Sequence, residues 1–180
     1  SMERRKEARF AVGHLALGYI LGKSSSKTLK TNLNIPLVFT LAVIPDIDIL
    51  VTNIEHRGPT HSILIGLMLF VPLFVIYRRK AIPYFIALIS HSVIGDHVAG
   101  GQTQLLWPLT TQRFGVSMSI QSQTNTTLEM VLFFSCILLL LRTKNITTFF
   151  ERRNSNLILA IPIFTVLLPT FLAYPLQVPP

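Results

Sequence analysis

Acidic and histidine side chains of this very apolar chain gather in a few short stretches. The stretches are Pro45-Asp46-Ile47-Asp48, His56 to Ser62 and Ser90 to His97. An aspartate at the centre of a lipid bilayer costs about 2.5–3.5 kcal/mol, so three would cost about 8–10 kcal/mol before any compensation. A divalent cation held by aspartate oxygens and histidine nitrogens would provide that compensation. The pattern therefore favours a metal site.

The composition indicates an integral membrane protein. Half of the 180 residues are hydrophobic, which is too many for an ordinary soluble surface, and the length fits one membrane-embedded domain over residues 1–180. The net charge of +8 comes from short Lys/Arg clusters between apolar segments, so no nucleic-acid partner is expected. The single cysteine, Cys136, excludes a disulfide framework and a thiolate metal site.

Apolar segments of helical length predict an all-α fold, an integral membrane bundle with five spanning helices plus a re-entrant or short N-terminal helix. The expected spans are Ile35 to Val51, Ser62 to Tyr77, Ala81 to Ala99, Leu128 to Leu141 and Leu157 to Tyr174, with Phe10 to Gly22 as the short N-terminal helix. Thr126-Thr127-Leu128-Glu129 fits a capping box at the start of the fourth span.

The basic residues set the predicted orientation. If segment 10–22 crosses the membrane, the two faces carry six and ten Lys/Arg residues; if it dips in and returns, they carry two and fourteen. Cytoplasmic loops are enriched in Lys and Arg, which favours the second arrangement. We therefore expect a cytoplasmic N-terminus, an external C-terminus and all three polar stretches near the extracytoplasmic face.

Pro45 is expected to interrupt the first full span. Proline lacks a backbone donor and disfavours helical geometry at Ile44, so the helix should break or kink there. In a regular helix Asp46 and Asp48 would point to opposite sides, whereas in an irregular helix end both can reach one centre. The alternative is a polar helix end where one aspartate serves as a cap.

The loop from His56 to His61 combines two histidines with Arg57, the one cation of this short loop. Thr60 can cap a helix that starts near His61. A helix N-terminus beside an arginine favours a bound phosphate or carboxylate, so Arg57 is a candidate substrate-binding residue. The alternative is that Arg57 pairs with Glu55 or meets lipid headgroups.

His91 and Asp96 are five residues apart, about 140° around a regular α-helix. A distortion at Gly95 or one π-bulge would bring both side chains to one centre. Ser92 already shares the face of Asp96, whereas His97 is expected to point away from the ligands.

His14 lies in the N-terminal apolar segment, where Gly18 and Gly22 form a small-x-x-x-small face that permits close helix approach. The imidazole should point into the bundle, either as a ligand or as a packed histidine bonded to a backbone carbonyl. The long connection Gly100 to Asn125, with its Trp107-Pro108 pair, is expected to be a lid or lipid-facing rim, or a simple interfacial anchor.

Taken in order, these motifs resemble the YdjM-like family of inner-membrane metal-dependent hydrolases over roughly residues 13–129. The motifs that carry the resemblance are Gly13-His14-Leu15, Pro45-Asp46-Ile47-Asp48, His56-Arg57-Gly58-Pro59-Thr60-His61-Ser62, Ser90-His91 with Asp96, and Leu105-Leu106-Trp107-Pro108. The resemblance implies a relationship to zinc-dependent phospholipases C and single-strand nucleases. It also implies the ligands His14, Asp46, Asp48, His61, His91 and Asp96; with His56 from the loop, seven side chains are candidates.

At one position the chain departs from the pattern expected of the family. A family histidine is expected four residues before the aspartate, where this chain has Ser92, so His91 reaches the site only through an insertion or bulge. Glu129 resembles a family acid in addition to fitting the capping box.

These observations predict a membrane-embedded metal-dependent hydrolase, with zinc favoured, that cleaves a phosphoester in a phospholipid or lipid-linked substrate by metal-activated water. Asp46 would be a ligand or the base that orients the water, and Arg57 would bind phosphate oxygens. The alternatives are a small transporter or ion-handling protein, and a membrane anchor with a structural metal site. The expected location is the plasma membrane of a prokaryote, with multiple spans.

Overall fold

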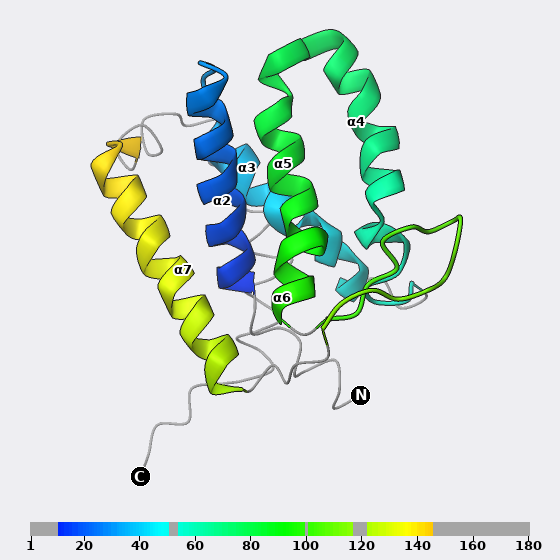
Figure 1. Ribbon diagram of the computed structural model, residues 1–180. Coiled ribbons are helices and arrows are strands. Elements are labelled where there is room, and N and C mark those ends of the chain that lie inside the picture. Colours follow the sequence, from blue (N-terminus) through cyan, green and yellow to red (C-terminus); the bar gives the residue numbers. More distant parts are fainter. Residues whose placement is uncertain (1–10, 51–53, 100, 117–121, 146–180) are drawn as a thin grey trace.

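The computed structural model describes residues 11–50, 54–99, 101–116 and 122–145 (Figure 1). In these ranges the chain is helical and has no β-sheet, and an isolated antiparallel bridge joins Thr103 to Phe114. The predicted all-α class is therefore confirmed.

The helices differ in length and in the length of their connections, the longest of which joins α6 to α7. In chain order they are α2 (Ala11–Thr28), α3 (Ile35–Val43), the 3₁₀ segment η2 (Ile44–Leu50), the 3₁₀ turn η3 (Pro59–His61), α4 (Ile63–Tyr77), the 3₁₀ turn η4 (Arg78–Lys80), α5 (Ile82–Ser90), the π-helical segment η5 (His91–Asp96), α6 (His97–Ala99) and α7 (Gln123–Arg142).

Helix α2 lies at the centre and packs against α3, α5 and α7. Its small residues make this packing close: a Cβ built on Gly18 would lie 2.4 Å from the Cβ of Ala42 in α3, and one on Gly22 would lie 3.3 Å from the carbonyl of Pro83 in α5. The predicted small-x-x-x-small face is confirmed. The buried core around it consists of Ala16, Tyr19, Ile35, Val38, Ala87 and Cys136.

The N-terminal segment, predicted as a re-entrant or short helix, is a helix in the structure. Residues 11–28 form one continuous helix of 18 residues, without a return, that runs from the α6 end of the bundle to the α4–α5 connection (Figure 1). If α2 crosses the membrane, the two faces carry six and ten basic residues. The charge difference that supports the predicted orientation is then smaller than with two and fourteen. The basic residues at positions 4–9 lie outside the described residues.

The other predicted spans correspond to helices with different bounds. Helix α4 and the continuous run α5–η5–α6 match two of them, Pro45 divides a third, and α7 begins five residues before the predicted Leu128. The predicted span Leu157 to Tyr174 lies outside the described residues. By length and composition, α7 is the one helix in the described ranges that is long and apolar enough to cross a membrane, so a bundle of five spans is not established.

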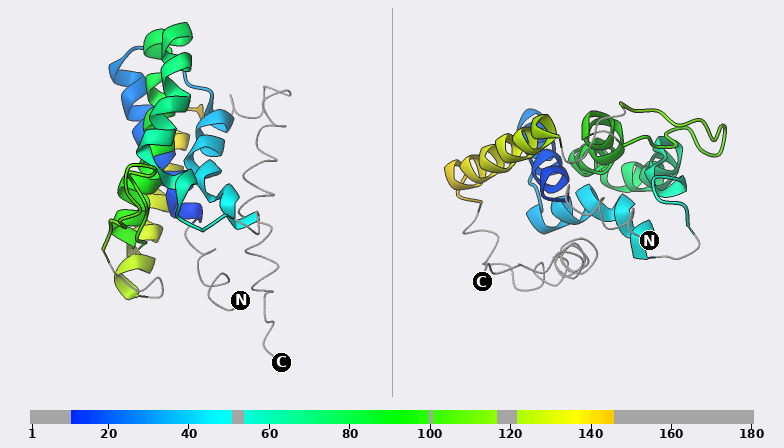
Figure 2. Two further views of the ribbon diagram at one scale, coloured as in Figure 1. Left: turned by 90° about the vertical axis from the view of Figure 1, so that its right-hand side faces the viewer. Right: turned by 90° about the horizontal axis from the view of Figure 1, so that it is seen from below.

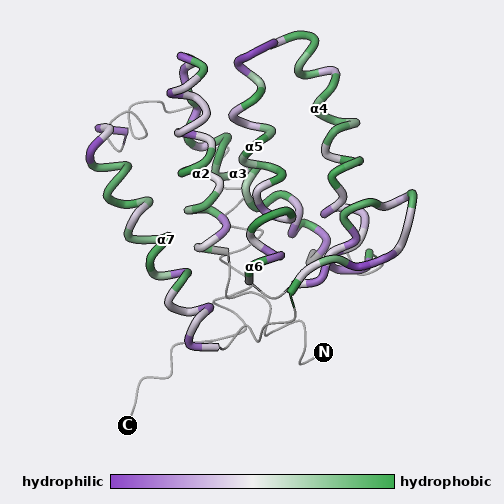
Figure 3. Tube along the Cα trace, in the orientation of Figure 1, coloured by the Kyte–Doolittle hydropathy of each residue, from purple (hydrophilic) through white to green (hydrophobic). Residues whose placement is uncertain are grey.

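Polar residues gather at the two ends of the bundle, and apolar residues lie between them (Figure 3). The C-terminal ends of α2, α4 and α7 point toward the same end of the bundle, which carries the basic turn η4 (Figure 1, Figure 2). The opposite end holds η2, η3, η5 and the loops that contain most of the candidate ligands.

Candidate metal centre

Pro45 ends α3 as predicted. The α-helix stops at Val43 and the chain continues as the 3₁₀ segment η2, in which both aspartates are buried. Asp46 and Asp48 then face the same imidazole from different sides: Asp46 Oδ1 lies 3.4 Å from Nε2 of His61, and Asp48 Oδ2 lies 3.4 Å from its Nδ1. The break thus brings both carboxylates close to His61, but they approach different nitrogens of its ring.

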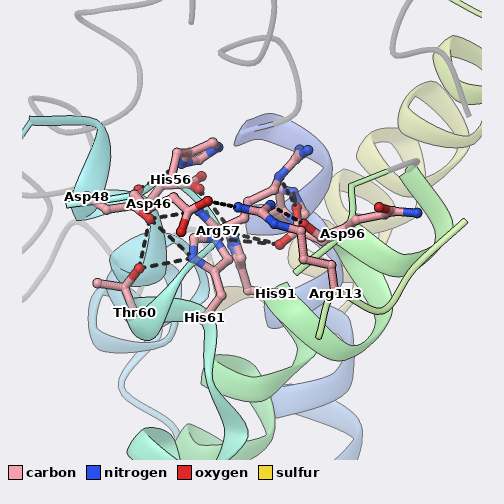
Figure 4. Close-up of polar contacts among 12 residues, drawn as sticks. Asp46, Asp48, His56, Arg57, Thr60, His61, His91, Asp96 and Arg113 are labelled. Atoms are coloured by element: carbon pink, nitrogen blue, oxygen red, sulfur yellow. Dashed lines mark hydrogen bonds and ion pairs between the residues drawn. The ribbon is translucent and has the colours of Figure 1, made fainter. Parts of the chain in front are cut away.

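Asp48 is the anchor of the loop that follows it (Figure 4). Its Oδ1 accepts a hydrogen bond from Nδ1 of His56 at 2.8 Å, and its Oδ2 accepts from the Thr60 hydroxyl at 2.8 Å and from the Arg57 backbone N–H at 3.1 Å. Arg57 has a positive φ of 61°, which the Asp48 contact holds in place. With its oxygens already satisfied, Asp48 is placed to orient the loop.

Thr60 does not cap α4, contrary to the prediction. Ser62 is the N-cap, and its hydroxyl accepts a hydrogen bond from the Leu64 N–H. The Ile63 N–H donates to the carbonyl of Leu105, so the start of α4 is occupied by the chain itself and does not support the predicted anion site there. Thr60 instead lies 3.0 Å from Nδ1 of His61, between that ring and Asp48.

The Thr60 hydroxyl donates to Asp48, so it accepts the proton of His61 Nδ1. This relay leaves Nε2 of His61 directed toward Asp46 Oδ1 at 3.4 Å and Asp96 Oδ2 at 3.5 Å. Such a carboxylate partner behind a histidine is the arrangement that orients histidine ligands in metal proteins. This role of Thr60 is not predicted from the sequence, where its hydroxyl is expected to cap a helix.

The π-helical segment η5 supplies the predicted bulge in α5. His91 begins it and Asp96 ends it, and the extra residue per turn places Nε2 of His91 3.8 Å from Asp96 Oδ2. Nδ1 of His91 donates to the Ala42 carbonyl at 2.7 Å, in the last turn of α3 where carbonyls lack helical partners. Nε2 therefore faces Asp46 Oδ1, at 3.3 Å.

His14 extends the cluster on the side of α2. Its ring stacks on that of His91 with centroids 4.0 Å apart, and its Nε2 lies 3.9 Å from Asp96 Oδ1. A Cβ on Gly95 would lie 2.1 Å from Nδ1 of His14, so glycine at this position makes room for the ring. His14 therefore points into the bundle as predicted.

Arg57 pairs with Asp96, not with Glu55. Its Nε lies 3.3 Å from Asp96 Oδ1, and its guanidinium rests on Gly101, where a Cβ would lie 2.5 Å from Cζ. Glu55 pairs instead with Arg113, from the loop 101–116 (Figure 4). The predicted alternative of an Arg57–Glu55 pair is wrong.

Buried polar atoms without a hydrogen-bond partner converge at the centre of the cluster. They are Nε2 of His61, Nε2 of His91 and Oδ2 of Asp96. Each of the two Nε2 atoms lies 3.3–3.8 Å from Asp46 Oδ1 and from Asp96 Oδ2. Donor atoms about 2.0–2.1 Å from a tetrahedral zinc lie about 3.3–3.4 Å apart, so these histidine–aspartate distances are close to those between ligands of one divalent ion.

The candidate ligands divide into three overlapping groups, each with donor atoms within 4.8 Å of one another. The groups are His14, His91 and Asp96; Asp46, His61 and His91; and Asp46, Asp48 and His56. The structure thus brings all seven predicted ligand residues together, with Asp48 and His56 at the edge. His97 belongs to none of these groups.

The charge of the cluster affects His61 most clearly. Burial alone would lower its pKa, but contacts with Asp46 and Asp48 and the charge of Asp96 raise the pKa to about 9. In the metal-free protein the imidazole is therefore doubly protonated and positively charged at neutral pH. Binding of a metal ion to Nε2 would displace one of the two protons.

The capping box predicted at Glu129 is wrong. Helix α7 begins at Gln123 with Ser122 as its N-cap, so Glu129 lies within the second turn. Its Oε1 accepts a weak hydrogen bond from the Gly13 N–H at 3.4 Å, and a Cβ on Gly13 would meet Glu129 Cγ at 2.9 Å. Glu129 therefore approaches the start of α2, next to His14.

The fold and the site define an all-helical protein with a buried histidine–aspartate cluster at one end of an apolar bundle. A family model described as "YdjM inner membrane protein" matches residues 10–176, so the chain belongs to this family. Comparison with curated proteins gave no match, and comparison with solved structures gave none either. Family membership establishes an inner membrane protein and supports the predicted prokaryotic plasma membrane.

Proposed function

We propose that the protein is a membrane-embedded metal-dependent hydrolase that cleaves a phosphoester in a phospholipid or lipid-linked substrate. The observation that carries the proposal is the convergence of buried His61 and His91 nitrogens and a buried Asp96 oxygen that make no hydrogen bond and lie within ion-pair distance of one another. Buried polar atoms without partners cost about 1–3 kcal/mol each, so a cluster of them indicates a ligand.

The donor set suits zinc. His61, His91 and Asp96 would hold the ion and leave a position for water, and the partners behind the imidazoles, Thr60 with Asp48 and the Ala42 carbonyl, would orient the rings. A divalent ion in such a site supplies Lewis acidity and makes water a nucleophile at neutral pH.

The chain itself contributes positioning and charge. Asp46 is the carboxylate that faces both imidazoles, so it is placed to accept a proton from the attacking water. Arg57 uses Nε for Asp96, which leaves its terminal N–H groups for the non-bridging oxygens of a phosphoester. We propose several spans and a site on the extracytoplasmic side, because the site side carries fewer basic residues than the opposite side whether or not α2 crosses: six against ten or two against fourteen.

Metal analysis and hydrolysis assays on the purified protein test the proposal. We expect stoichiometric divalent metal and hydrolysis of a phospholipid or an aryl phosphodiester, with both lost in His61→Ala. His97→Ala is the matched control, since His97 belongs to none of the ligand groups, and it should retain both. A well-folded wild-type protein that binds no metal would overturn the proposal.

The transporter and anchor alternatives make different predictions. Proteoliposome flux of a cation without hydrolysis would favour an ion-handling protein. Metal that persists in the absence of any hydrolysis would favour a structural site.

A further inference from the structure

A groove of about 250 Å³ leads from the outer surface of the bundle to the candidate metal centre. It runs between α2, the η5–α6 segment and α7. Most of its walls are apolar side chains, of which Val98 and Val131 are exposed at its mouth. His14 and Gly95 form its inner end.

The inner end of the groove is polar. Nδ1 of His14 has no hydrogen-bond partner although the residue is only 5 % exposed, and Asn125 and Glu129 lie on the facing wall. Leu17 and Leu132 continue the groove away from this end. A polar end joined to an apolar channel matches a molecule with a polar head and a hydrocarbon chain.

The depth of the groove also fits a lipid. Helix α7 is long and apolar enough to span a membrane and only 11 % of its apolar window is buried. Along the axis of α7, the groove residues extend from Asn125, about 3 Å from the first residue of the helix, to Leu132, about 14 Å from it. Chains of the nearer leaflet occupy this depth in a bilayer whose hydrocarbon core is about 30 Å thick.

We propose that this groove binds an acyl chain of a phospholipid and admits the lipid sideways, between α2 and α7, to the metal centre. The inference rests on the proposed function for what happens to the headgroup, but binding of the chain does not require hydrolysis. The occupant is a phospholipid because an inner membrane protein presents the open mouth of the groove to lipid.

A phospholipid with a photoactivatable diazirine in its acyl chain tests the proposal on full-length protein in detergent, with metal removed by a chelator. Cross-links should concentrate at groove residues of α2 and α7. In Val131→Trp, which narrows the mouth, we expect the yield to fall about tenfold, the loss when about two methylene groups leave apolar contact. Met130→Trp is the matched control, since Met130 is the adjacent residue, is similarly exposed and does not line the groove.

Cross-links spread evenly around α7, with equal yields in the three proteins, would overturn the inference. Hydrolysis is measured separately on a long-chain phospholipid and on a water-soluble aryl phosphodiester. We expect Val131→Trp to lower the ratio of the first rate to the second by a similar factor. If the wild type hydrolyses neither substrate, the proposed function fails, and the cross-linking still decides whether the groove binds lipid.

Discussion

The inner helices and the outer helices of this bundle are built differently. Helices α2, α3 and α5 pack closely through small residues and carry the buried cluster, and two of the three change to 3₁₀ or π geometry where the ligands lie. Helices α4 and α7 keep regular α geometry at the depth of the bundle and expose large apolar side chains. Irregular backbone in this apolar bundle thus occurs where the polar side chains are buried. There, neighbouring groups can hydrogen-bond to the backbone carbonyls that have lost their helical partners.

The outer helices should be sensitive to charge in a way that exposed residues of soluble proteins are not. Phe134 is 59 % exposed near the middle of α7, so in a bilayer it faces lipid. Phe134→Asp should raise the apparent free energy of membrane insertion of residues 123–142 by about 2.5–3.5 kcal/mol. A translocon insertion assay measures this, with Phe134→Leu as control; equal insertion of both variants would mean that α7 does not face lipid.

The inner helices should be sensitive to size. A Cβ on Gly18 would lie 2.4 Å from that of Ala42, so Gly18→Ala should destabilise the protein by about 1–3 kcal/mol through separation of α2 from α3. Gly66 in α4 has its nearest neighbours at 3.8 Å, and the same change there should be neutral or stabilise by about 0.5 kcal/mol. Thermal unfolding in detergent compares the two variants. Similar losses of stability would show that the inner and outer helices do not differ in their tolerance of a larger side chain.

A change behind the ligands should weaken metal binding without removing a ligand. Asp48→Asn alters the relay through Thr60 to His61, and loss of such a partner typically lowers metal affinity about 10–100-fold. Metal affinity from chelator competition measures the effect. Glu55→Gln, which alters a partly exposed pair with Arg113, serves as control and should leave the affinity unchanged.

A pH dependence is expected for the metal-free protein. The pKa of His61 is raised from 6.5 to about 9 in the folded chain. Its contribution to stability is then fully present below about 6.5 and is lost as the pH rises through about 9. The thermal midpoint of chelated protein should therefore fall between pH 7 and pH 9.5, and His61→Gln should reduce this difference; an identical slope in the variant would contradict the assignment.

The sequence predicted the local irregularities well because their causes are local. Pro45 lacks an N–H, which by itself requires the end of α3, and the five-residue spacing of His91 and Asp96 can meet one centre only with an extra residue in the turn. The gathering of the seven candidate ligands followed from these breaks and from the topology.

Contacts between distant segments could not be derived in the same way. The choice of Ser62 over Thr60 as N-cap depends on Asp48, which takes the Thr60 hydroxyl, and the pairing of Arg57 with Asp96 depends on how the loop crosses η5. The close packing of α2 against α3 and α5 is likewise a contact between distant segments, which a count of charges does not reveal. In each case, the choice between alternative partners depends on contacts that exist only in the folded chain.

The loop 101–116 is joined to residues 57–63 by two backbone hydrogen bonds and one from a side chain. Gln104 donates to the Arg57 carbonyl, Ile63 donates to the Leu105 carbonyl, and the Ser62 hydroxyl donates to the Trp107 carbonyl. Swinging this loop away would break all three, at about 0.5–1.5 kcal/mol each, and would also disturb the first turn of α4. The loop 101–116 is therefore held firmly against the ligand-bearing loop, and a metal ion bound as we propose should exchange slowly with the bulk solution.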